Sequence, residues 1–370
     1  MDRDGENNRE QQQGPLDLVN GLEYPSPLKA DETWGILDST KMKTLMRCPR
    51  KYFYEYILGW RIDKPNLHLE FGIAWHLAME HLLDGYRRRG QYSEEDLPGA
   101  MERFIEHYSL HWDMAWETAN SPKNMENAAK ALQQYIKRFK NEEQIEVLFT
   151  EVAGTVPVTA QGHVLHFKID LVFRDYRGIL IRDHKTTGRD TKVWRETWQL
   201  DIQMANYTHV LFMLFPENEV YGAEVNGAIL RKGDNDFARI DIRKTKEMMQ
   251  TWEWQTGYRL AELDNYHRRL AASKESDPVL TTFPRQETAC GDYNSVCPYF
   301  AFCQAWSNPL QYAGKPPPGF KVEFWNPRKN AEEGARYKFD AATRTIEDLT
   351  DGKEEKDEHA VEGQDTGGTP

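Results

Sequence analysis

The hydrophobic period of the chain changes near residue 146, and this change restricts the available folds more than any other feature. Before it, apolar residues recur at the spacing of a helix face, whereas after it β-branched and aromatic residues form three runs separated by turns at Gly162 and Gly178. Strands that are followed by a helix and then by further strands predict a mixed sheet with helices packed on it. We therefore expect an α/β (α+β) fold whose first part is helical.

The pattern assigns most of the chain to regular elements. Ser39 or Thr40 is expected to cap a helix that runs through MKTLMRCPRKYFYEYIL and ends at Gly59. Further helices are expected at about 67–86, 94–118, 122–145, 197–215 and 243–272. Strands are expected at about 147–159, 163–175, 178–187, 220–232 and 237–243.

The net charge of −12 comes from the two ends of the chain. Residues 1–36 carry a charge of −5 and residues 331–370 a charge of −7, so the part between them is neutral. Both ends are poor in apolar residues, which predicts a disordered acidic segment at 1–36 and an extended to disordered acidic tail at 311–370. The polar N-terminus shows neither a secretory signal nor a transit peptide, and a cytoplasmic protein is expected.

The part between these ends, residues 37–310, is expected to form one domain. We divide it into a helical region at 37–146, a sheet core at 147–272 and a cysteine-containing segment at 280–307. Its longest apolar stretch is far shorter than the ~20 residues of a membrane span.

Two carboxylates and a lysine lie on consecutive predicted strands. Asp170 occurs in FKIDLVF, and Asp183 with Lys185 occurs in LIRDHKTT. A tight turn near Gly178 between antiparallel strands places the two carboxylates side by side at one end of the sheet, where they can chelate a hard divalent cation. Because side chains alternate along a strand, Lys185 points to the same face as Asp183. Such a site suits phosphodiester hydrolysis, since a metal ion neutralises phosphoryl charge and activates water.

Further residues complete a pattern that resembles a known family of proteins. A helix with Gln203 and Tyr207 at i and i+4 follows the strands, and an upstream helix carries His76 in FGIAWHLAMEHLL. With the Asp and the D-x-K strand, these residues resemble the core of the PD-(D/E)XK nuclease superfamily. The helical His, preceded by CPRKYFYEYILG, is similar to the RecB, AddB and CRISPR-associated RecB-like nucleases, and the resemblance covers roughly residues 37–307.

The resemblance implies a restriction-endonuclease-like core with a central mixed sheet and a metal site on it. Carried over by position, the ligands of Mg²⁺ or Mn²⁺ are His76, Asp170, Asp183 and the backbone carbonyl of His184. Lys185 then positions or activates the attacking water.

The resemblance also implies an activity and partners. It implies a deoxyribonuclease, most simply an exonuclease, that acts in DNA recombination, repair, or phage or CRISPR-type DNA processing. Gln203 and Tyr207 then orient the active site or hold the DNA backbone, and Arg47, Arg50 and Lys51 offer a basic DNA-binding surface. A helicase or recombinase is a further expected partner, because the chain has no G-x-x-x-x-G-K-[ST] motif of its own for ATP-driven unwinding.

Two other interpretations stay open. The chain can be a catalytically silent DNA-binding module of a helicase–nuclease complex, or Asp170, Asp183 and Lys185 can form a structural ion-pair network. Glu151, at the start of the first strand, is expected to be structural, because acids are common at strand boundaries. The side chains of His81 and His184 are expected to be bystanders.

The four cysteines, Cys48, Cys290, Cys297 and Cys303, predict a second site. A chain expected in the cytoplasm rarely forms disulfides, and four thiolates suit either tetrahedral zinc or a four-iron four-sulfur cluster. The long gap after Cys48 resembles the iron staple of AddB-like and CRISPR-associated RecB-like nucleases, so we favour iron–sulfur and keep zinc as the alternative. The last three cysteines are spaced C-x6-C-x5-C where these relatives commonly have C-x2-C-x5-C, which makes Cys290 the least certain ligand.

Overall fold

A mixed β-sheet positions most of the residues singled out by the sequence. The structure is a computed structural model that describes residues 19–120, 122–141, 144–292 and 295–350. The strands of the sheet are β2 (Glu146–Pro157), β3 (Val164–Asp175), β4 (Gly178–Thr187), β5 (Val220–Ile229), β6 (Asp236–Arg243), β10 (Tyr337–Asp340) and β11 (Thr345–Asp348). Their order is β11-β10-β2-β3-β4-β5-β6. β3 and β4 are antiparallel, whereas β4 and β5 are parallel, which confirms the predicted mixed sheet.

The long helices lie largely where the periodicity of the sequence predicts them, although the single helix expected at 94–118 is divided in two and several short helices were not expected. The helices are α2 (Ser39–Arg47), α3 (Pro49–Tyr52), α4 (Leu67–Arg89), α5 (Leu97–Tyr108), α6 (Met114–Asn120), α7 (Met125–Phe139), α8 (Lys192–Thr197), α9 (Ile202–Leu214), α10 (Lys246–Ala272), α11 (Phe300–Ala305) and α12 (Pro327–Glu332). Short 3-10 or π turns connect several of them. No helix in the described part of the chain is long and apolar enough to cross a membrane.

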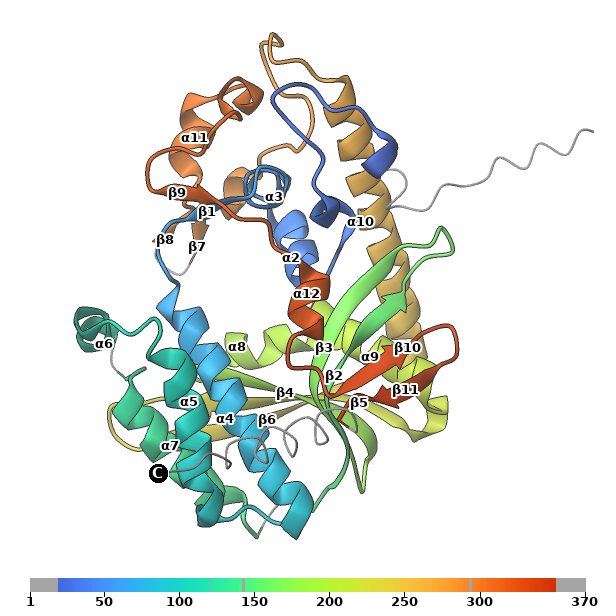
Figure 1. Cartoon of the computed structure of the whole chain (residues 1–370). Helices are drawn as coiled ribbons and strands as arrows, with labels where there is room; N and C mark the ends of the chain where they lie inside the picture. The colour runs from blue at the N-terminus through green and yellow to red at the C-terminus, as the bar shows by residue number, and fades with distance from the viewer. Residues whose placement is uncertain (1–18, 121, 142–143, 293–294, 351–370) are drawn as a thin grey trace, which may run out of the picture. The chain divides into compact units, whose positions relative to one another are not determined.

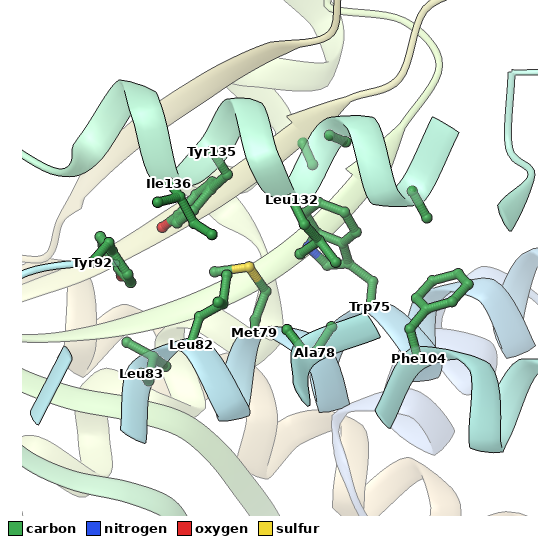
Figure 2. Close-up of a cluster of buried hydrophobic side chains, with 14 of the residues drawn as sticks. Trp75, Ala78, Met79, Leu82, Leu83, Tyr92, Phe104, Leu132, Tyr135 and Ile136 are labelled. Carbon is green, nitrogen blue, oxygen red and sulfur yellow. The ribbon is translucent and has the colours of Figure 1, made fainter. Parts of the chain in front are cut away.

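A large hydrophobic core lies between the sheet and the helices α4, α5 and α7, which run beside one another in Figure 1. Figure 2 shows side chains of α4 and α7 meeting between the two helices, among them Trp75, Met79 and Leu132. Leu171 of β3 and Leu180 of β4 close this core from the sheet. Burial of this many large apolar side chains, each contributing about 1.5–3 kcal/mol, fixes α4 on the sheet.

The other face of the sheet carries α9. Because side chains alternate along a strand, the neighbours of Leu171 and Leu180 point away from the α4 core. α9 contacts both β4 and β5, and Asp201 caps its first turn by accepting hydrogen bonds from the backbone N–H groups of Gln203 and Met204. The cap sets where α9 begins, and thereby which of its residues lie near the strand ends.

The chain folds into two compact units, each assembled from three segments. Unit 1 comprises Met1–Ile62, Pro157–Leu165 and Thr251–Pro327, and unit 2 comprises Asp63–Val156, His166–Gln250 and Arg328–Pro370. Unit 2 contains most of the sheet and the α4 core. This division differs from the predicted single domain at 37–310, because each unit draws on distant parts of the sequence.

In unit 1, the expected first helix is interrupted. Asp38, and not Ser39 or Thr40, caps α2, because its side chain accepts a hydrogen bond from the Lys41 N–H. The helix then ends at Cys48, whose backbone is extended, and Pro49 begins α3. Proline lacks the N–H that would continue the helix, so the CPRKY segment starts a new turn. A π-helical segment, Phe53–Ile57, follows and ends before Gly59.

Both ends of the chain contain ordered structure that the composition did not predict. Val19, Trp34 and Ile36 are buried, although disorder was expected for 1–36. The tail at 311–370 was expected to be extended to disordered, and in its described part β10 is an ordered strand that pairs with β2 and buries Tyr337 and Phe339. β9 (Phe320–Val322) likewise pairs with β1 (Trp60–Ile62). The same predictions also cover residues 1–18 and 351–370, which lie outside the described residues.

Candidate functional site

Three elements of unit 2 bring the predicted catalytic residues together. Asp170 lies on β3 and Asp183 on β4, and the antiparallel register pairs Leu171 with Arg182. The next step of this register sets Asp170 opposite Asp183 at one end of the two strands. His76 reaches this end from α4, and Lys185 lies two residues beyond Asp183 on the same strand face.

Each carboxylate has a basic partner. His76 Nδ1 lies 3.0 Å from Asp170 Oδ2, and Lys185 Nζ lies 2.6 Å from Asp183 Oδ2. The backbone N–H of His184 also donates to Asp170 Oδ2, at 2.9 Å. The two acids are therefore held in place by neighbouring strands and by α4, not by a flexible loop.

The site is buried at its base and open at its rim. The side chain of Asp183 is only 3% exposed, whereas His76 is 32% and Lys185 26% exposed. Within the described part of the chain, Asp183 Oδ2 makes no other polar contact than the ion pair with the Lys185 ammonium, at 2.6 Å. A buried carboxylate oxygen with this deficit is a suitable cation ligand, so the residues present fit a hard divalent metal ion.

The pKa values of the two acids are shifted in opposite directions. Burial raises the pKa of Asp170, but the opposing effect of His76 and of the His184 N–H is larger, so the net pKa lies below its usual range. Burial and the charge of Asp170 raise the pKa of Asp183, and Lys185 compensates only in part. Burial would lower the pKa of Lys185, yet the carboxylate of Asp183 raises it overall. The lysine is consequently a cation, and Asp170 is an anion, near neutral pH.

Gln203 and Tyr207 form a hydrogen-bonded chain behind Asp183. Gln203 Nε2–H lies 3.4 Å from Asp183 Oδ1 and 2.7 Å from the Tyr207 hydroxyl, which donates to the Lys168 carbonyl at 2.6 Å. Tyr207 is buried. Its hydroxyl is engaged inside the fold by Gln203 and the Lys168 carbonyl, and contact with the DNA backbone stays a prediction.

A charged network lies beside the two acids, and the residue pattern reveals only part of it. Lys168, two residues before Asp170 on the same strand face, lies 2.9 Å from Glu151 Oε2. Burial, aided by Asp170 and by Glu80 of α4, raises the pKa of Glu151 to about 7. Glu151 has a φ of 50°, a conformation that is uncommon for residues other than glycine. The i, i+2 spacing of Lys168 and Asp170 was the available signal, whereas Glu80 gave none.

The two bystander histidines have packing roles. His184 is buried, and its Nδ1 lies 2.7 Å from the side-chain nitrogen of Asn226. Burial lowers the pKa of His184 to about 3, so the ring is neutral. The His81 ring packs against the backbone at Gly99.

Comparison with known proteins identifies the family. The model of the PD-(D/E)XK nuclease superfamily matches residues 39–304, which is more than half of the chain. The chain belongs to the PD-(D/E)XK nuclease superfamily. The membership accounts for the mixed sheet with flanking helices, and it indicates a metal-dependent nuclease. No curated protein matches. Among solved structures, the crystal structure of SSO0001 is similar at 14% identity and a TM-score of 0.24, over 51% of this nuclease and 85% of that chain.

The four cysteines of the nuclease all lie in unit 1 and form no disulfide. The Cys297 N–H donates to the Cys290 carbonyl at 2.9 Å, and Cys303 lies on α11. Burial raises the pKa of Cys303 to about 11, and the neighbouring Cys48 and Cys297 add to the shift. Burial, with contributions from Cys48 and Cys290, likewise raises the pKa of Cys297. The thiols are thus close enough to affect one another's charge, across the long gap in sequence.

The predicted basic cluster of the nuclease separates into different roles. Arg50 is buried, and its guanidinium donates to the carbonyls of Phe283, Leu280 and Thr282 at 2.9–3.4 Å. It therefore joins two segments of unit 1, and its guanidinium is occupied by these carbonyls, whereas the expected DNA contact stays a prediction. Lys51 lies 3.7 Å from Glu55, in a partly exposed i, i+4 pair.

Arg47, in contrast, lines a cavity of about 440 Å³ within unit 1. Arg259 and Arg285 line the same cavity, together with Glu262, which pairs with Arg259 at 2.7 Å.

Proposed function

We propose that this chain is a deoxyribonuclease that hydrolyses phosphodiester bonds with the help of Mg²⁺ or Mn²⁺, and that it acts as an exonuclease on DNA ends in recombination, repair or the processing of foreign DNA. The observation that carries the proposal is the convergence of His76, Asp170, Asp183 and Lys185 at one end of β3 and β4. The RecB-like and AddB-like character of the sequence motifs supports the finer assignment.

In this proposal the ligand atoms come from His76, Asp170, Asp183 and the backbone carbonyl of His184. A divalent metal ion bound there supplies charge neutralisation at the phosphoryl oxygens and lowers the pKa of a water molecule. For ligation, His76 must offer an unprotonated ring nitrogen, which means that it gives up its proton to bind.

The other side chains act on the water and the phosphate. Lys185 is charged and partly exposed, so its ammonium can donate a hydrogen bond to the attacking water or to a phosphoryl oxygen and stabilise the charge that develops there. Gln203 orients Asp183, and Tyr207 in turn orients Gln203. The Tyr207 hydroxyl is itself held by its hydrogen bond to the Lys168 carbonyl. These two are positioning residues.

The proposal is tested with end-labelled single- and double-stranded DNA, incubated with and without Mn²⁺. The Lys185→Ala variant should lose at least about a hundredfold in rate, because its ammonium acts on developing charge. Lys192→Ala is the matched control, since Lys192 lies on α8 and is 84% exposed. Unaltered cleavage by Lys185→Ala would contradict the assignment. DNA binding without cleavage by the wild-type protein would favour the silent binding module.

We also propose that Cys48, Cys290, Cys297 and Cys303 hold a four-iron four-sulfur cluster with a structural role, with zinc as the alternative. The raised pKa values of Cys297 and Cys303, to which neighbouring cysteines contribute, and the partial burial of all four thiols support a shared metal site. Four sulfur ligands suit both metals. Anaerobic purification followed by iron, sulfide and zinc analysis separates the two, and a colourless protein with one zinc ion would overturn the iron–sulfur assignment.

A further inference from the structure

A group of two histidines and one glutamate lies in unit 2, on residues that the nuclease proposal does not use. Glu70 is in the first turn of α4, His107 is in the last turn of α5, and His111 follows in a turn closed by a hydrogen bond from its own N–H to the Tyr108 carbonyl. One carboxylate oxygen, Glu70 Oε2, lies 3.0 Å from His107 Nε2 and 3.5 Å from His111 Nε2. All three ligand atoms lie within 4.8 Å of one another.

These separations match the coordination shell of a small transition-metal ion. With metal–ligand distances of about 2.0–2.1 Å, the ligands of a tetrahedral zinc ion are about 3.3 Å apart. The two Glu70–histidine distances lie on either side of that value. Two imidazoles and one carboxylate are also a donor set that zinc accepts, with a fourth position left for water.

The surroundings hold the three side chains in this arrangement before any ion binds. Phe71, next to Glu70, packs edge-on against Phe104 and Tyr108 of α5, with ring centroids 5.2 Å and 5.7 Å apart. All three rings are buried. The ligand positions of Glu70 and His107 are therefore fixed by the adjacent core, which reduces the ordering cost of binding a metal ion.

The helix termini add favourable electrostatics. The carbonyl end of α5 carries partial negative charge and favours a cation next to His107. The amide end of α4 carries partial positive charge and favours the ionised form of Glu70. The ligand side chains are partly exposed, at 15% for Glu70 and 36% for His111, so an ion can enter from solvent.

We propose that Glu70, His107 and His111 form a binding site for Zn²⁺ or a chemically similar transition-metal ion, separate from the nuclease site and from the cysteines. The ion joins the start of α4 to the end of α5. Because α4 also carries His76, the bound ion stabilises the helix that presents a catalytic side chain. Its expected role is structural, and binding does not require nuclease activity.

Binding is tested with Co²⁺, a spectroscopic substitute for zinc, on full-length protein carrying Asp183→Asn to remove a ligand of the nuclease site. Visible absorption typical of nitrogen and oxygen ligands, without the thiolate charge-transfer band, is expected for this site. His107→Ala and Glu70→Gln should each weaken binding at least tenfold. Glu70→Gln keeps the size and hydrogen-bonding capacity of the side chain, so it separates ligation from a simple hydrogen-bonded link between the helices.

His68→Ala is the matched control, because His68 lies on the same helix, is exposed and is not part of the group. It should bind Co²⁺ as tightly as its parent, and one equivalent of Zn²⁺ should raise the melting temperature of the parent but not of His107→Ala. Equal affinities of the parent, His107→Ala and Glu70→Gln would overturn the proposal. That outcome leaves the nuclease proposal intact, since the variants are compared for binding and not for DNA cleavage.

Discussion

Among single residues, Glu224 shows how a buried charge is kept in the fold of unit 2. It lies on β5, almost fully buried, and accepts from Arg182 at 2.7 Å, Arg177 at 3.0 Å and Arg239 at 3.1 Å. Burial alone would raise its pKa, but the three guanidinium groups outweigh burial and lower the pKa to about 2. Three strands, β4, β5 and β6, are thereby connected through one carboxylate.

This arrangement predicts how stability depends on pH. A carboxyl group whose folded-state pKa is depressed stabilises the fold above its unfolded pKa of about 4.3, and the contribution is lost as the pH falls towards 2. Glu224→Gln should therefore lower the free energy of unfolding by about 3 kcal/mol at pH 7. Urea unfolding at pH 7, 4 and 3 measures the difference from wild type, which should shrink below pH 4. Glu217→Gln, at an exposed ion pair with Lys246, is the control.

Tyr207 leads to a prediction about rate. Tyr207→Phe removes the hydroxyl that bonds to Gln203 and to the Lys168 carbonyl, while the buried ring remains. We expect kcat to fall about tenfold with little change in KM, because Asp183 loses part of its orientation. The cost in stability should be only about 1 kcal/mol. Tyr176→Phe, at a residue that is 95% exposed, should retain the wild-type rate. A selective rise in KM would instead indicate a substrate contact.

The residue pattern allowed only part of this site to be predicted. Asp170, Asp183 and Lys185 were accessible because their relation is local, on two strands joined by one turn. The electrostatic effect of Asp170 on Glu151 depends on the placement of a third strand and on Lys168. Arg50 looked like a surface cation because its three carbonyl partners come from the distant residues 280–283. Long-range partners of charged residues leave no periodic signal.

At the level of elements, the strands β2–β6 follow from local sequence patterns, whereas the strands near the C-terminus depend on long-range pairing. The former combine a strand-like pattern with short turns, and all were predicted. β10 has only two buried apolar residues, Tyr337 and Phe339, within an acidic segment. Its partner β2 is far away in sequence, with Tyr337 aligned to Val152 in a parallel pair. Composition therefore suggested a disordered tail where tertiary pairing orders the chain.

The structure predicts that this terminal element supports the site. The Arg336 N–H donates to the Glu151 carbonyl, and its guanidinium lies 2.7 Å from Glu80. A chain that ends after Asn326 loses β10, β11 and these contacts, and it should be several kcal/mol less stable than a chain that ends after Thr350. Phe339→Ala alone should cost about 3 kcal/mol. Thermal and urea unfolding of the purified chains test this, and equal midpoints for the two truncated chains would contradict it.

For the whole molecule, the division into two units assigns the proposed nuclease site and the proposed cysteine site to different units. His76, Asp170, Asp183 and Lys185 all belong to unit 2, whereas the four cysteines all belong to unit 1. Each unit therefore contains the complete set of side chains for its own site. A thiolate site that joins Cys48 to the segment 290–303 closes a long loop, which should stabilise unit 1 by several kcal/mol.

This separation predicts that the two sites can be lost one at a time. Asp183→Asn should abolish DNA cleavage and leave the iron and sulfide content unchanged, because it alters no residue of unit 1. Cys303→Ser should release the metal and lower the melting temperature of the protein by several degrees, since the cross-link between distant segments is gone. Iron analysis, calorimetry and a DNA cleavage assay on both variants provide the measurements. Loss of iron from Asp183→Asn would contradict the independence of the two sites, and an unchanged melting temperature of Cys303→Ser would contradict a structural role for the thiolates.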